Sequence, residues 1–122
     1  MTEIQNSKHY DLEERTFLFA RRVNEYINKL PKTITSIENS KQLARSAGSV
    51  GANYIEANES LSKKDFAMRV KISRKEAKES IFWLRLIEPL DSQQKEKEYL
   101  IQEATELMKI FGAILTKMIC KT

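Results

Sequence analysis

Apolar residues recur every three or four positions along most of this chain, the spacing that places side chains on one side of an α-helix. Four such stretches predict helices over about residues 11–29, 39–59, 62–88 and from 91 onward. The predicted buried stripes are Leu12, Thr16, Phe19, Val23, Ile27 and Leu30; Leu43, Ala47, Val50, Tyr54, Ala57 and Leu61; Phe66, Val70, Ser73, Ala77, Ile81 and Leu84; and Leu100, Ala104, Leu107, Phe111, Ile114 and Met118.

Prolines and capping residues set the expected ends of these helices. Pro31 ends the first helix and Pro89 follows the third, because proline lacks the amide hydrogen that a helix interior needs. Ser62 or Asp65 is placed to cap the third helix, and Gln94 is placed for a capping box at the start of the fourth. The segment "PKTITSIEN" is expected to be a loop.

Four amphipathic helices with short connections fold most simply as an antiparallel up-down bundle. We therefore expect an all-α protein with a flexible tail over residues 1–10 and a single four-helix domain over residues 11–122. The length of 122 residues is sufficient for one modest core.

The chain carries more apolar side chains than one buried stripe per helix requires. The excess lies on the first and third helices and comprises Phe17, Leu18, Ile72, Trp83 and Leu86. A wide core stripe would explain it, and so would a subunit interface, since large exposed apolar patches are rare on monomers. We favour the interface, because the excess recurs on two helices.

Small and polar residues mark two further sides of the second and third helices. Gly48 and Gly51 weaken an isolated helix, so we expect them to allow another backbone to approach closely. Glu76 and Glu79 interrupt the second apolar stripe of the third helix. Because buried carboxylates need partners, we expect these two to lie at a rim or to pair with Lys or Arg of this or a neighbouring chain.

The formal net charge of +4 is compatible with a nucleic acid, an anionic membrane surface or an acidic partner, but also with an ordinary solvated surface. The single cysteine, Cys120, excludes an internal disulfide and suits a reducing compartment. The sequence has no apolar run of spanning length and no apolar segment typical of a signal peptide at its start. These features predict a cytoplasmic protein that is not bound to a membrane.

Residues suited to catalysis or metal binding are few. The only histidine, His9, lies in the expected tail, which argues against histidine-based acid–base catalysis and against a Glu-x-x-His metal centre. The segment "SAGSVGAN" lacks the lysine of a phosphate-binding loop, and Ser46 and Ser49 have no adjacent base. We expect no metal, no cofactor and no enzymatic activity.

One positive signal for function is a row of cations on the third helix. A basic stripe, by which we mean Lys71, Arg74, Lys75, Lys78 and Arg85, shares one side of this helix. Such a linear cationic surface suits phosphate recognition, and the alternative is an ordinary solvated face. We assign no aromatic residue to the exposed side of the stripe, so base stacking is not indicated.

Two segments of the second and third helices, "QLARSAGSVGANYIEAN" and "DFAMRVKISRKEAKESIFWLRLI", resemble a known family. They are similar to the bacterial four-helix-bundle proteins first noticed as open reading frames in intervening sequences of 23S ribosomal RNA genes. The fold also occurs in the accessory protein of diversity-generating retroelements. The family pattern falls on Arg45, Ser46, Ser49, Asn53, Glu56, Glu76, Glu79, Trp83 and Leu84. The family usually has Glu-Gly where this chain has Glu56-Ala57, so we expect the second helix to run further here.

This resemblance implies an up-down bundle assembled as a homopentameric ring, possible binding of nucleic acid through basic surfaces, and no established enzymatic activity. Two functions follow as hypotheses. The first is an oligomeric bundle that binds structured RNA or DNA electrostatically through the basic stripe. The alternative is an interaction scaffold whose partner is another protein, without direct binding of nucleic acid.

Overall fold

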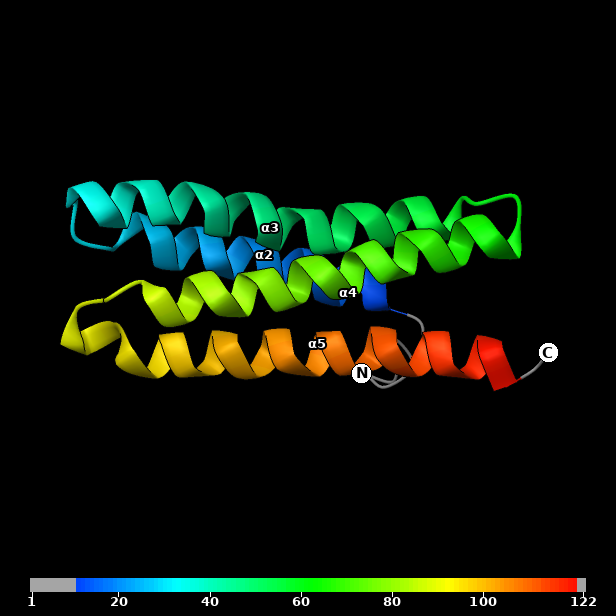
Figure 1. Ribbon diagram of the computed structural model, residues 1–122. Coiled ribbons are helices and arrows are strands. Elements are labelled where there is room, and N and C mark those ends of the chain that lie inside the picture. Colours follow the sequence, from blue (N-terminus) through cyan, green and yellow to red (C-terminus); the bar gives the residue numbers. More distant parts are fainter. Residues whose placement is uncertain (1–10, 121–122) are drawn as a thin grey trace, which may run out of the picture.

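Residues 11–120 are described by a computed structural model, and they form four long helices connected by short turns. The helices are α2 (Leu12–Asn28), α3 (Ile34–Asn58), α4 (Lys63–Leu86) and α5 (Gln94–Cys120), with a short 3-10 turn, η1 (Asp91–Gln93), before α5. Figure 1 shows the helices lying along a common direction, with their connections at two opposite ends of the bundle. The predicted all-helical bundle is thus confirmed, and no strand occurs within residues 11–120. The tail expected for residues 1–10, with His9, and residues 121–122 lie outside the described part.

Side-chain caps define the starts of three helices. Asp11 accepts a hydrogen bond from the backbone N–H of Glu14, and Ser62 accepts one from that of Asp65. The predicted start of the second helix was wrong, because Thr33 caps α3 by accepting from the Ser36 N–H at 3.1 Å. The segment expected to be a loop is therefore mostly the first turn of α3, since a good cap offsets the weak helix propensity of β-branched residues.

The junction between α4 and α5 also differs from the expectation. α4 ends at Leu86, two residues before the predicted end, and Ile87 is extended. Gln93, rather than Gln94, turns back to accept a hydrogen bond from the Leu90 N–H, and its own amide donates to the Tyr26 backbone oxygen at 3.0 Å. This bond ties the last turn before α5 to the end of α2.

The four predicted stripes supply most of the core. Fully buried residues shared with the prediction are Thr16, Phe19, Val23, Leu30, Leu43, Ala47, Val50, Ala57, Val70, Ser73, Ala77, Leu84, Leu100, Ala104, Leu107 and Phe111. In α2, Tyr26 is buried where Ile27 was expected, and Ile27 only packs at the edge. Leu61 is fully exposed, because α3 ends at Asn58 and Leu61 falls in the turn that follows. Ala57 lies buried within the last turn of α3, which runs past the Glu56-Ala57 position as expected.

Only one of the two central glycines permits a close helix contact. A Cβ added to Gly51 would lie 2.8 Å from Thr16 Oγ1, which places the backbone of α3 directly against α2. The corresponding position at Gly48 meets nothing within 4 Å, so the predicted role of Gly48 was wrong.

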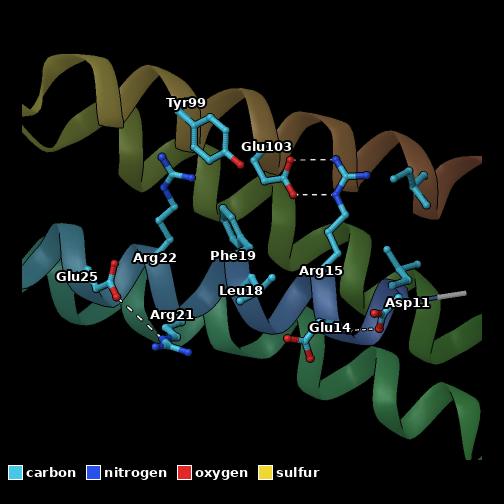
Figure 2. Close-up of a pocket in the computed structure, with 12 residues that line it drawn as sticks. Asp11, Glu14, Arg15, Leu18, Phe19, Arg21, Arg22, Glu25, Tyr99 and Glu103 are labelled. Carbon is cyan, nitrogen blue, oxygen red and sulfur yellow. Dashed lines mark hydrogen bonds and ion pairs between the residues drawn. The ribbon is translucent and has the colours of Figure 1, made fainter. Parts of the chain in front are cut away.

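Arginine–glutamate pairs connect α2 to α5 across a groove, and Figure 2 shows the one between Arg15 and Glu103. Arg15 forms a two-pronged ion pair with Glu103, with N–O distances of 2.7 and 2.9 Å, and Arg22 forms an equivalent pair with Glu96. The Arg22 guanidinium also lies 3.8 Å from the centre of the Tyr99 ring. The groove has a volume of about 930 Å³, and Leu18, Phe19 and Ile110 contribute apolar surface to it. No helix in the described part of the chain is long and apolar enough to cross a membrane.

Candidate functional site

All members of the basic stripe are exposed on α4. None of their side chains forms an ion pair or a hydrogen bond with another residue of the described range 11–120, although the backbone oxygen of Arg85 accepts from Lys97 Nζ at 3.3 Å. The aliphatic part of Arg74 lies close to Gly112 of α5, with its Cδ 3.9 Å from the place a Cβ would occupy there. The stripe therefore presents positive charge to solvent without a direct ion pair to a carboxylate, although Glu79 attracts Lys75 at longer range.

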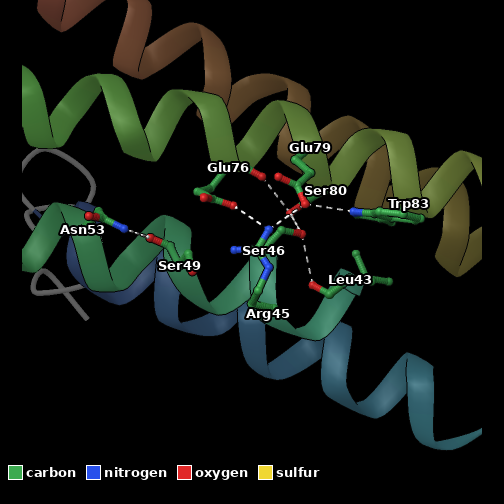
Figure 3. A network of polar contacts seen from close by, with 9 residues as sticks. All are labelled: Leu43, Arg45, Ser46, Ser49, Asn53, Glu76, Glu79, Ser80 and Trp83. Carbon is green, nitrogen blue, oxygen red and sulfur yellow. Dashed lines mark hydrogen bonds and ion pairs between the residues drawn. The ribbon is translucent and has the colours of Figure 1, made fainter. Parts of the chain in front are cut away.

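The acidic residues of α4 that lie among these cations are turned the other way, toward α3. Arg45 of α3 reaches Glu79 at 2.5 Å and Glu76 at 3.2 Å, and Figure 3 shows it lying between the two helices. Glu76 is only 7% exposed, and Glu79 accepts a second bond from the Trp83 indole N–H at 3.0 Å. The expectation that these carboxylates pair with Lys or Arg is confirmed, with Arg45 of the same chain as the partner.

The hydrogen bonds of this network fix its charge state. The bond from Trp83, and then those from Arg45, lower the pKa of Glu79, although partial burial opposes the shift. The bonds to Glu79 and Glu76 in turn raise the pKa of Arg45. At neutral pH Glu79 is therefore ionised and paired with Arg45, on the side of α4 that faces α3.

Two buried serines hold α3 and α4 together beneath the ion pairs. The hydroxyls of Ser46 and Ser80 lie 2.9 Å apart, and both are completely buried. The Ser80 hydroxyl also bonds to the Glu76 backbone oxygen, and the Ser46 hydroxyl to that of Leu43. Every polar contact of Ser46 is thus a packing contact, and no base capable of activating it is among them.

The remaining motif positions have local roles. Asn53 donates to the Ser49 backbone oxygen at 2.9 Å and accepts from Arg69 of α4 at 2.9 Å. Glu56 is exposed, and its backbone oxygen accepts from the Ser60 hydroxyl, whereas Leu84 belongs to the core. Most of the motif therefore fastens α3 to α4. Among the described residues, no cluster of three or more His, Cys, Asp or Glu side chains is placed to hold a metal ion.

The candidate interface residues lie in two places. Phe17 and Leu18 on α2 are 55% and 49% exposed, and Leu86 on α4 is 49% exposed. Ile72 and Trp83 are half-buried, with Trp83 packed against the edge of the core. The two helices thus present separate apolar patches, and that of α2 borders the groove toward α5.

The sequence analysis missed the position of Phe82. This ring is 54% exposed and lies within the row of cations, which corrects the expectation that no aromatic residue interrupts the exposed side of the stripe. The signal was present in the spacing: Lys71, Lys75, Lys78, Phe82 and Arg85 follow one another at intervals of four, three, four and three. The residue was difficult to assign because Ile81, Trp83 and Leu84 beside it are buried or half-buried.

Comparisons with known proteins agree with this fold. Residues 8–113 match the family model described as "23S rRNA-intervening sequence protein". The chain is also similar to a crystal structure of a protein of unknown function from the S23 ribosomal protein family of Bacteroides thetaiotaomicron, with 29% identity and a TM-score of 0.73. That likeness covers 84% of this chain and 96% of the other. A comparison with curated proteins finds no match.

Proposed function

This chain belongs to the family of 23S rRNA-intervening sequence proteins, and from that premise we propose that it is a non-enzymatic helical bundle that binds structured RNA or DNA through the basic stripe of α4. The observation that carries the proposal is the separation of charge on α4: its cations are exposed and unpaired within the described residues, whereas Glu76 and Glu79 are held by Arg45. Phosphates are the ligands that such a surface recognises without a pocket.

The dimensions of the stripe suit a nucleic-acid backbone. From Lys71 to Arg85 the helix rises by about 21 Å at 1.5 Å per residue. At 3.4 Å per nucleotide along a strand, this length corresponds to roughly six phosphates. A rigid helix presents its cations at fixed positions, so the stripe needs no ordering of a loop before it binds.

Charge reversal tests the placement. We expect Lys75→Glu together with Lys78→Glu to weaken binding of a labelled RNA stem–loop, measured by fluorescence anisotropy over a series of salt concentrations. Removing one lysine that binds a phosphate should reduce the slope of log K against log salt by about 1, so the double variant should reduce it by about 2.

A matched control distinguishes binding at the basic stripe from attraction of RNA by the net charge of the whole chain. Lys95→Glu with Lys109→Glu changes two exposed lysines of α5 and brings the formal net charge from +4 to zero, as the α4 variant does. This control should keep most of the affinity and of the salt slope. An equal decrease in affinity for both variants would show that net charge alone drives binding, and an unchanged α4 variant would refute the stripe.

The exposed apolar patch of α2 favours a second candidate, a scaffold that binds protein. Leu18 lines the groove between α2 and α5 and Phe17 is its exposed neighbour in the chain, so a neighbouring subunit or another protein could bury them. A homo-oligomer is the simplest such assembly. Leu18→Glu should then lower the mass measured by light scattering, and a wild-type mass equal to one chain would exclude self-association.

A further inference from the structure

Phe82 is the one aromatic side chain in the exposed row of cations on α4. Lys78 lies one turn before it and Arg85 one turn after it, so the Cβ atom of each is about 5–6 Å from that of Phe82. Just over half of the side chain is exposed, at 54%. An aromatic ring left in water between two unpaired cations is an unusual use of apolar surface, since it contributes little to the core.

The ring is supported from one side. Phe82 and Trp83 meet edge to face, with ring centres 4.8 Å apart and an angle of 81° between the planes. Trp83 is itself held by its indole N–H, which donates to Glu79 at 3.0 Å. Glu79, the carboxylate one turn before Phe82 on this flank, is also bound by Arg45. Phe82 therefore rests on a fixed neighbour, and the carboxylate of Glu79 is already paired with a cation.

We propose that Phe82 is a stacking platform for an unpaired base of a nucleic acid whose phosphates lie along the basic stripe. This inference rests on the proposed function and narrows its ligand from structured nucleic acid in general to a stem with an unpaired loop or bulge. A base in a continuous duplex has no free face, so only an unpaired base stacks on a protein side chain.

The charges around the ring favour a nucleotide over another apolar partner. A stacked base brings its own phosphate within reach of Lys78 and Arg85, the cations one turn before and one turn after the ring, whereas Glu79 and Leu86 lie on its other flank with Trp83. Phe17 of α2 provides the contrast: it is equally exposed, at 55%, but Glu13 and Glu14 precede it by one turn, and Arg21, the cation one turn after it, is paired with Glu25. That setting repels phosphate, so exposure alone does not make an aromatic residue a stacking site.

The test compares a stem–loop RNA with a fully paired duplex of the same stem sequence. We expect the wild-type chain to bind the stem–loop about 5- to 150-fold more tightly, which is the range for one stacked base. Phe82→Ala should bring the affinity for the stem–loop down to that for the duplex and leave duplex binding unchanged. Phe82→Tyr should retain the preference, and Phe82→Leu, which is apolar but has no π-face, should abolish it.

The chain supplies its own control and its own reporter. Phe17→Ala removes an aromatic ring of the same exposure from α2 and should leave both affinities unchanged. Trp83 is the single tryptophan and lies against Phe82, so stacking should change its fluorescence on adding the stem–loop but not the duplex. Circular dichroism of each variant shows whether the bundle remains folded.

The outcomes distinguish the stacking platform from the proposed binding of nucleic acid by the basic stripe, on which it rests. Equal binding of stem–loop and duplex, with both weakened by reversal of Lys75 and Lys78, would overturn the stacking platform while keeping the basic stripe. A stem–loop preference that Phe82→Ala does not reduce would also overturn it. Failure of the wild-type chain to bind either RNA at low salt would overturn both proposals.

Discussion

Replacing Gly51 by alanine tests the closest approach between helices in this bundle. The new Cβ would lie 2.8 Å from Thr16 Oγ1 and 3.1 Å from Thr16 Cβ. Thr16 cannot easily move away, because it is completely buried and its hydroxyl donates to the Glu13 backbone oxygen at 2.9 Å. Either α2 or α3 must shift, and such overpacking costs about 1–3 kcal/mol.

The net effect includes a favourable contribution from the helix itself. Alanine stabilises a helix interior by about 1 kcal/mol relative to glycine, so Gly51→Ala should change the free energy of unfolding by roughly zero to −2 kcal/mol. Gly48→Ala gains the same propensity but meets nothing within 4 Å, so it should raise the free energy of unfolding by about 1 kcal/mol. Because both sites are in α3, the propensity effects cancel, and the difference of about 1–3 kcal/mol isolates the steric cost.

Urea unfolding followed by circular dichroism, at one fixed protein concentration, measures both variants. Thr16→Ala removes the atom at 2.8 Å, so combining it with Gly51→Ala should recover part of the stability beyond the sum of the two single effects. Equal stability of Gly51→Ala and Gly48→Ala would refute the close contact. A strictly additive double variant would place the strain elsewhere.

Two titratable groups give further predictions. The Tyr26 hydroxyl is buried without a hydrogen-bond partner among the described residues, so Tyr26→Phe should be neutral or stabilising by up to about 2 kcal/mol in urea unfolding. Burial, with a smaller effect of Glu96, raises the pKa of Tyr26 to about 12. The unfolded chain therefore releases the phenolic proton first, and the free energy of unfolding should fall as pH rises from about 10 through 12. Tyr26→Phe should lack this alkaline decrease, and a variant less stable than wild type at neutral pH would contradict the burial argument. Hydrogen bonds from Trp83 and Arg45 lower the pKa of Glu79, so its stabilisation is present above the unfolded value of 4.5 and disappears as pH falls through the lower folded value. Glu79→Gln should therefore lower the free energy of unfolding at neutral pH, by no more than about 1 kcal/mol because the pair is partly exposed. The difference in free energy of unfolding between wild type and variant should disappear in acid. A difference that does not depend on pH would show that the charge of Glu79 is not responsible.

The apolar periodicity predicted most of the core because burial in a bundle follows the helical period directly. Leu43, Ala47 and Val50 were placed correctly for this reason. The helix ends were predicted less well, since they depend on single side chains. Thr33 starts α3 five residues before the predicted position by capping it.

The bridges between α2 and α5 depend on how two distant helices align, which the periodicity of one helix does not reveal. A trace of them was nevertheless present in the sequence. Arg15 and Arg22 are seven residues apart, and so are their partners Glu103 and Glu96 in the antiparallel helix. Matching spacings of opposite charge on two predicted neighbours would have suggested this pairing.

The ion pairs of three arginines explain how a chain of modest net charge can have one strongly basic face. Arg15 and Arg22 are neutralised by glutamates of α5, and Arg45 is neutralised by the two glutamates of α4. The last pairing has two effects at once: it fastens α3 to α4 and withdraws negative charge from the outward side of α4. The basic stripe is thereby left without carboxylate partners in the described chain, on the helix whose position the motif fixes. The family motif and the proposed binding surface are therefore parts of one arrangement, in which the inward side of α4 determines what its outward side presents.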